Sequence, residues 1–141
     1  MIPPIVIDTN VLVAALKSRL GASFKLLMAL PSGSYNPCLS VPLFVEYESV
    51  VKRPGLVPDL SADDIDGVLN YFLSRDSIHE IFFLWRPFLK DPKDDLVLEA
   101  AVASHSQYLV TFNVRDFADV EKHFGIKVVT PQEFLREQRL I

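Results

Sequence analysis

Four acidic residues stand beside the apolar runs of this sequence, where their carboxylates could gather for metal-ion chemistry. Asp8 directly follows the apolar run 5–7, and an unpaired carboxylate at the end of a buried strand is costly to desolvate. Glu46, Asp95 and Asp116 lie near the starts of predicted helices or the ends of predicted strands. If the four side chains share one crevice, each raises the pKa of the others unless cations neutralise them.

Carboxylate oxygens of this kind are the ligands that Mg²⁺ and Mn²⁺ prefer. Two such ions about 3.5–4 Å apart can activate a water and stabilise the leaving oxygen in phosphodiester hydrolysis. The four acids therefore predict a site for one or two Mg²⁺ or Mn²⁺ ions, with Asp8 as a metal ligand.

The elements that would position these acids alternate between strands and helices. Short apolar or β-branched runs predict strands over 4–7, 38–41, 78–84, 108–112 and 126–130, and helical spacing predicts helices over 23–30, 42–52, 61–75, 91–106 and from Pro131. Ser40, Ser61 and Asp91 are the predicted N-caps of three of these helices. The alternation predicts a three-layer α/β/α fold with a central, mainly parallel sheet, similar to Rossmann-like domains.

The predicted sheet gives the acids a common edge. In open parallel sheets, ligands bind outside the carboxyl ends of the strands, near the point where the strand order reverses. Asp8 and Asp116 each follow a predicted strand, whereas Glu46 and Asp95 lie on helices that start at this edge. One crevice could therefore collect all four carboxylates.

Each acid also has a purely structural interpretation, which the sequence leaves open. Asp8 could cap the next helix or form an Asx turn, and Asp116 could cap a helix that follows it. Glu46 could be an ordinary solvated helix residue. Asp94 stands three residues after Asp91, at the capping-box position, and any carboxylate in a first helical turn is favoured by about 0.3–1 kcal/mol.

Length and composition narrow the class of protein. The 141 residues predict one domain over residues 1–141, and half of them are hydrophobic. No apolar run reaches the roughly 18 residues of a membrane span, and the N-terminus lacks the features of a secretory signal. Cys38 is the only cysteine, which excludes an internal disulfide and indicates a cytoplasmic protein. The net charge of −4 argues against broad, non-specific nucleic-acid binding.

Four segments carry a resemblance to a known family. They are "VIDTNVLVAAL" (6–16), "SVPLFVEYESVVKRP" (40–54), "DPKDDLVLEAAVAS" (91–104) and "LVTFNVRDF" (109–117), and they span nearly the whole chain in the family's order. In these segments the chain resembles PIN-domain ribonucleases of the VapC type, the toxins of bacterial toxin–antitoxin pairs. The resemblance implies metal-dependent endoribonuclease activity on RNA.

The resemblance also assigns roles to residues. It implies a catalytic and metal-binding quartet of Asp8, Glu46, Asp95 and Asp116. Asp95 fits better than Asp94, because the family's helical acid precedes the threonine of the "TxNxxDF" motif by the same spacing. Asp94 remains a possible substitute. The residues that would orient carboxylates or water beside the quartet are Thr9, Asn10, Asp94, Thr111 and Asn113.

Binding partners follow partly from charge and partly from the resemblance. Lys17, Arg53 and Arg115 are the candidate contacts to RNA phosphates. Arg53 lies two helical turns after Glu46 and so on the same face, although a positive charge at a helix C-terminus also complements the helix dipole. The resemblance implies a homodimer and a protein antitoxin. The aromatic segment 81–88 is predicted to pack in the core, with a dimer or antitoxin surface as the alternative.

Two other functions compete with the ribonuclease. A phosphatase of the haloacid-dehalogenase type also places an Asp after its first strand, but it needs a second Asp where Asn10 stands. The stronger alternative is a PIN-like module that binds RNA or protein without cutting, because the identity of the ligands does not guarantee their placement within about 0.5 Å.

Overall fold

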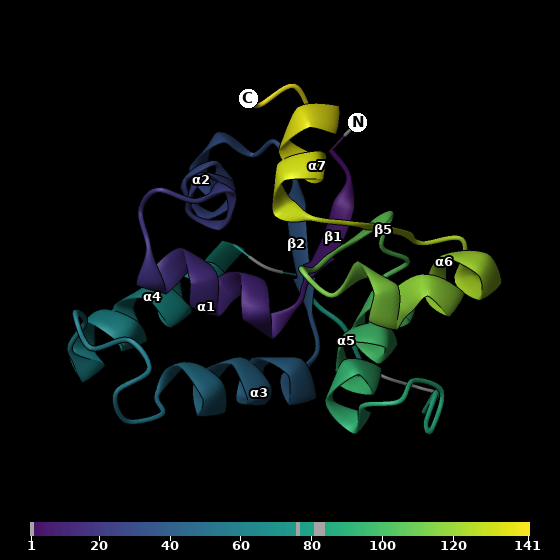
Figure 1. The fold of residues 1–141 in the computed structure, drawn as a ribbon, viewed down its shortest axis with the longest axis horizontal. Coiled ribbons are helices and arrows are strands. Elements are labelled where there is room, and N and C mark those ends of the chain that lie inside the picture. Colours follow the sequence, from purple (N-terminus) through teal and green to yellow (C-terminus); the bar gives the residue numbers. More distant parts are fainter. Residues whose placement is uncertain (1, 76, 81–83) are drawn as a thin grey trace.

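The computed structural model describes residues 2–75, 77–80 and 84–141 and contains a parallel sheet of five strands in the order β3-β2-β1-β4-β5 (Figure 1). The strands are β1 (Pro4–Ile7), β2 (Asn36–Leu39), β3 (Ser77–Ile78), β4 (Tyr108–Val110) and β5 (Lys127–Val129). The register pairs Ile5 of β1 with Pro37 of β2 on one side and with Tyr108 of β4 on the other. β1 is therefore the central strand.

Helices lie on both sides of this sheet. They are α1 (Thr9–Lys17), α2 (Ala22–Met28), α3 (Val41–Val51), α4 (Ala62–Arg75), α5 (Pro92–Ala103), α6 (Ala118–Phe124) and α7 (Pro131–Glu137), with short 3₁₀ turns at Leu30–Ser32 and Val114–Phe117. In Figure 1, α1, α2 and α4 lie to the left of the strands, α6 lies to their right, and α5 lies below β1 and β5. This arrangement confirms the predicted three-layer α/β/α fold.

The core explains why the strands read as continuous apolar runs. Ile5, Val6 and Leu109 are fully buried, because helices cover both faces of a parallel sheet. Phe117 and Phe134, from outside the strands, belong to the same cluster of buried hydrophobic residues. None of the helices in the described part of the chain combines the length and apolar character that a bilayer crossing requires.

The predicted helix starts are confirmed by their capping hydrogen bonds. The Ser40 side chain accepts from the backbone N–H of Leu43, and the Asp91 side chain caps α5. Ser61 and Asp64 form a reciprocal capping box at the start of α4, with both hydrogen bonds at 3.1 Å. Local sequence therefore determines where these helices begin.

The predicted strand over 78–84 differs most from the structure. Among the described residues of this stretch, Ser77–Ile78 forms a strand, and the backbone N–H of His79 donates one further hydrogen bond to the carbonyl of Leu39, whereas His79, Glu80 and Leu84 are not in a strand. Residues 81–83 of the aromatic segment lie outside the described residues. Further along that segment, Trp85 packs edge-on against Phe124 of α6, with ring centroids 4.9 Å apart.

Candidate active site

Asp8 lies at the topological switch point of the sheet. It follows the central strand β1, and the strands next along the chain lie on one side of β1 while β4 lies on the other. Asp8 is 6% exposed, and Thr111 at the end of β4 donates a hydrogen bond of 2.7 Å to its carboxylate. Burial raises the pKa of Asp8, and hydrogen bonds from Thr111 and Thr9 partly offset this rise.

The Asp8 side chain does not cap the helix that follows it. Asp8 occupies the N-cap position of α1, but its carboxylate makes no capping hydrogen bond. Thr111 is fully buried and, besides donating to Asp8, accepts from the backbone N–H of Asn113 at 2.9 Å. The hydroxyl of Thr111 thus ties the loop after β4 to the acid after β1.

A pocket of about 350 Å³ opens in front of Asp8. Acids, amides, cations and apolar side chains share its lining, which consists of Asp8, Thr9, Asn10, Val13, Glu46, Val50, Arg53, Leu56, Asp91, Lys93, Asp94 and Asn113. We call it the acidic pocket. It brings together residues from α1, α3, the start of α5 and the loop after β4.

Asp94 is the acid from α5 that lines the acidic pocket. Its pKa is raised from 3.8 to about 7, first by burial and then by the negative charges of Asp8, Asp91 and Asp116. Asp91 precedes Asp94 by three residues and therefore lies on the same side of the first helical turn. Several carboxylates thus contribute negative charge to this pocket.

Asp95, which the sequence favoured for the quartet, is not among the residues that line this pocket. It is 1% exposed, and its carboxylate accepts a 2.9 Å hydrogen bond from the backbone N–H of Leu89. Successive helical residues point about 100° apart, so the side chain of Asp95 leaves α5 in a different direction from that of Asp94. The geometry places Asp94 beside Asp8 and turns Asp95 toward the preceding loop.

A second buried acid anchors the same loop. This acid is Glu99, which lies one turn after Asp95 and is 1% exposed. Its carboxylate accepts a hydrogen bond from the backbone N–H of Trp85. The guanidinium of Arg86 donates to both of its carboxylate oxygens. Together Asp95 and Glu99 hold the chain of residues 85–89 against α5. Asp95 therefore has a structural contact that accounts for its burial.

Glu46 reaches the acidic pocket from α3. The hydroxyl of the next residue, Tyr47, donates to the carbonyl of Ile7 at the end of β1, which fixes α3 beside Asp8. Lys93 lies across the pocket, with its Nζ 3.8 Å from a carboxylate oxygen of Glu46. Lys93 is thus a cation inside the acidic pocket.

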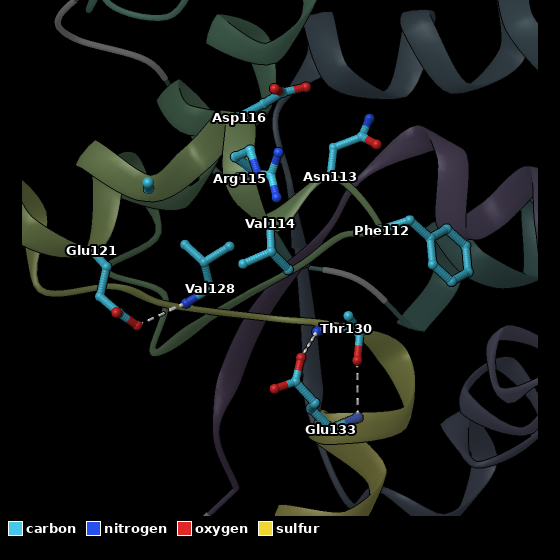
Figure 2. A pocket seen from close by; sticks show the side chains of 10 residues that line it. Phe112, Asn113, Val114, Arg115, Asp116, Glu121, Val128, Thr130 and Glu133 are labelled. Atoms are coloured by element: carbon cyan, nitrogen blue, oxygen red, sulfur yellow. Dashed lines mark hydrogen bonds between the residues drawn. The ribbon is translucent and has the colours of Figure 1, made fainter.

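Asp116 lines a second, larger pocket that adjoins the first. This pocket has a volume of about 760 Å³ and is lined by Phe112, Asn113, Val114, Arg115, Asp116, Ala118, Glu121, Val128, Thr130 and Glu133 (Figure 2). We call it the β5 pocket. Asn113 lines both pockets, and the charge of Asp116 contributes to the raised pKa values of Asp8 and Asp94. Asp116 therefore lies at the border between them.

The three cations expected to contact RNA take different positions. Arg53 lines the acidic pocket, and Arg115 lines the β5 pocket. Lys17 lies exposed at the end of α1 and lines neither pocket. The sequence predicted Arg53 on the helix of Glu46, but α3 ends at Val51, so Arg53 lies in the loop after that helix.

The acidic pocket offers oxygen donors that suit a hard divalent cation. The side-chain oxygen of Asn10 is buried without a hydrogen-bond partner among the described residues, and Asn10 lines the pocket beside Asp8 and Asp94. In the same part of the chain, no three His, Cys, Asp or Glu residues already form a metal-binding cluster. Mg²⁺ needs none, since it keeps several waters and usually takes one or two carboxylates. The donor set therefore fits Mg²⁺ or Mn²⁺.

Sequence reasoning missed two charged residues of the acidic pocket. Asp91 was assigned only as an N-cap, and its capping hydrogen bond to the backbone of Lys93 does not prevent it from lining the pocket. Its three-residue spacing from Asp94 was a usable signal. Nothing in the sequence indicated a role for Lys93 except its position between Asp91 and Asp94, since its contact with Glu46 of α3 depends on tertiary packing.

Comparison with known proteins agrees with this architecture. Residues 4–115 match the family model of the PIN domain. Twelve chains of solved structures are similar to this chain. One belongs to the crystal structure of VapBC2 from Rickettsia felis bound to a DNA fragment from their promoter, with a TM-score of 0.57, 18% identity, and 89% of this chain and 96% of that chain covered. At this identity the likeness concerns the fold. No curated protein sequence matches the chain.

Proposed function

Because the chain belongs to the PIN-domain family, we propose that it is a metal-dependent endoribonuclease that hydrolyses phosphodiester bonds of RNA. The observation that carries this proposal is the grouping of Asp8 and Asp94 in one pocket at the switch point of the sheet. Burial, together with the negative charges of the neighbouring carboxylates, raises the pKa of Asp94 to about 7. A divalent cation would offset the repulsion among these carboxylates. A single carboxylate that only caps a helix experiences no such repulsion.

Asp8, Asp94 and Asp116, together with Glu46, would hold one or two Mg²⁺ or Mn²⁺ ions. When bound, the metal supplies positive charge for the attack of water on a phosphodiester. Thr111 orients the carboxylate of Asp8, and the unpartnered amide oxygen of Asn10 can accept a hydrogen bond from a water in the pocket. In this assignment Asp94 replaces Asp95, whose carboxylate anchors Leu89.

Two cations of the acidic pocket can receive the RNA backbone. Arg53 is exposed on the pocket wall, and Lys93 can exchange its long contact with Glu46 for a phosphate oxygen. Arginine and lysine are the usual partners of phosphate groups. Their placement beside the acids lets RNA approach a pocket that would otherwise repel it.

The proposal extends to partners and location. One structural neighbour belongs to a VapBC2 complex, and we propose that this chain acts as the toxin of a toxin–antitoxin pair, inhibited by a protein antitoxin. Dimerisation with a second copy and a cytoplasmic location, where RNA is available and Cys38 stays reduced, belong to the same proposal.

The decisive experiment compares two neighbouring substitutions. Purified protein is incubated with a pool of structured and single-stranded RNAs in Mn²⁺, in Mg²⁺ or in EDTA, beside Asp94→Asn and Asp95→Asn. We expect cleavage that requires metal, is lost in Asp94→Asn and persists in Asp95→Asn, whose amide oxygen can still accept from Leu89.

Other outcomes of this assay point elsewhere. Cleavage that survives Asp94→Asn but not Asp95→Asn would return the catalytic role to Asp95. RNA binding without cleavage in any metal would favour a PIN-like module that binds without cutting. Circular dichroism of both variants controls for folding.

A further inference from the structure

Beside the proposed metal site, the β5 pocket has the lining of a nucleotide subsite. We propose that it holds one RNA nucleotide next to the cleaved bond and favours a base with an exocyclic amino group over uracil. This inference rests on the proposed ribonuclease function, because it needs RNA lying across the acidic pocket.

The location of the β5 pocket supports this placement. Asn113 lines both pockets, so a chain that crosses the acidic pocket can continue directly into the other. The backbone N–H of Asp116 donates to the carbonyl of Asn113 at 2.9 Å, which closes the turn between the two residues. The wall between the pockets is therefore one short, hydrogen-bonded turn.

The walls of the β5 pocket suit the flat face of a base. Val114, Ala118 and Val128 contribute apolar surface, and Figure 2 shows Val114 and Val128 side by side in the middle of the lining. The volume of about 760 Å³ lies within the range of roughly 300–1,000 Å³ that small-molecule sites occupy. An aromatic ring can therefore be covered on an apolar wall while its edge meets the polar rim.

Two glutamates on the rim are held so that they can read that edge. One oxygen of Glu121 accepts from the backbone N–H of Val128 at 3.2 Å, and one oxygen of Glu133 accepts from that of Thr130 at 3.0 Å (Figure 2). Among the described residues, neither glutamate lies within ion-pair distance of a lysine or arginine. Each carboxylate thus keeps a second oxygen to accept from a ligand.

A free carboxylate oxygen distinguishes bases by their donors. Carboxylates accept hydrogen bonds from the exocyclic amino group of cytosine, and adenine and guanine carry such groups as well. Uracil instead presents a single N–H between two carbonyl oxygens, and a carboxylate repels these oxygens. Glu121 and Glu133 therefore favour amino-bearing bases.

Arg115 supplies the positive charge that a nucleotide needs. Its side chain lies between Asp116 and Val114 in Figure 2, and it is exposed. In the part of the chain that the structure describes, no carboxylate lies within ion-pair distance of it. Arg115 can therefore bind the phosphate of the nucleotide while the glutamates contact its base.

Binding to a cleavage-deficient protein tests the subsite apart from catalysis. Fluorescently labelled uridine pentanucleotides with A, C, G or U at the centre are titrated in Mg²⁺ against the Asp8→Asn protein. Glu121→Gln, Glu133→Gln and Arg115→Ala are then added singly to this background. Glutamine can still accept the backbone hydrogen bonds and satisfies the capping box, so the fold is retained. Glu80→Gln, at an exposed site that lines neither pocket, is the control for charge.

We expect the A, C and G oligonucleotides to bind about 2- to 10-fold more tightly than the U oligonucleotide, the worth of a single hydrogen bond. Glu121→Gln or Glu133→Gln should reduce this preference. Arg115→Ala should weaken all four about equally and lower the slope of log affinity against log salt by about one. Glu80→Gln should change neither quantity.

Two results would overturn the inference. One is a base preference that is absent, or unchanged in both glutamine variants. The other is an Arg115→Ala protein with unaltered affinity and salt dependence. Failure of the ribonuclease proposal would look different, because it would leave wild-type protein unable to cleave RNA whatever the Asp8→Asn protein binds.

Discussion

Asp94→Asn should stabilise the metal-free protein relative to wild type, and this gain in stability should be larger at alkaline pH than at acidic pH. The pKa of Asp94 in the folded protein is about 7, above its ordinary value of 3.8, because burial and the charges of Asp8, Asp91 and Asp116 disfavour its ionised form. Between these two values the folded state holds a proton that the unfolded state has released. Wild type therefore loses stability as the pH rises from about 4 through about 7, and asparagine removes this loss.

The size of this gain in stability follows from the difference between the pKa of Asp94 in the folded protein and its ordinary value. Raising the pKa of a carboxyl from 3.8 to about 7 corresponds to about 4 kcal/mol when the group is fully shielded from water. Asp94 is only partly buried, and solvent screening reduces the expected gain to about 1–2 kcal/mol. For a chain of this length that gain raises Tm by a few degrees, about 2–4 °C for each kcal/mol.

The measurement is urea denaturation in EDTA, followed by far-UV circular dichroism, at about pH 5 and about pH 8. Wild type, Asp94→Asn and Asp95→Asn are compared, and Asp95→Asn serves as the control on the adjacent residue. A free-energy difference between Asp94→Asn and wild type that is the same at both pH values would refute the raised pKa of Asp94. An increase of the same size in Asp95→Asn would show that the wrong acid had been assigned to the pocket.

Three other perturbations test separate parts of the site. Mn²⁺ at about one hundred times its dissociation constant should stabilise wild type by about 2.7 kcal/mol in thermal denaturation, and equal shifts in Asp8→Asn would exclude that residue from the metal site. Thr111→Val removes the hydrogen bond to Asp8 and should weaken Mn²⁺ affinity about 10- to 100-fold by calorimetry, with unchanged affinity counting against an orienting role. Glu99→Gln keeps the shape of the side chain but loses the charge that binds Arg86, so it should lower the free energy of unfolding by about 1–3 kcal/mol in urea. A neutral effect there would mean that the loop before α5 does not depend on this ion pair.

The comparison of Asp94 with Asp95 shows where sequence reasoning reached its limit. Both residues lie in the first turn of α5, where carboxylates are favoured whatever their function. Counting residues back from Thr111 selected Asp95, although the pocket is lined by Asp94. A spacing of one residue along the chain becomes a rotation of about 100° on a helix, and the packing of α5 against the sheet decides that rotation.

Local patterns in the sequence determined most of the secondary structure. The apolar runs predicted β1, β2, β4 and β5, and the capping residues Ser40, Ser61 and Asp91 marked their helix starts because a side-chain cap satisfies N–H groups close by in the chain. Of the strand predicted over 78–84, residues 81–83 lie outside the described residues, and the described residues 79, 80 and 84 are not in a strand, because an apolar run does not show how far the backbone pairing extends.

The position of Asp8 was also within reach of the sequence, because a residue that follows the first strand of a parallel α/β fold must lie at the carboxyl edge of the sheet. The tertiary structure alone decided what surrounds Asp8. Lys93 meets Glu46, and Thr111 meets Asp8 across more than one hundred residues of chain. Such contacts depend on how helices and strands from distant segments pack, and no periodicity within a single segment encodes them.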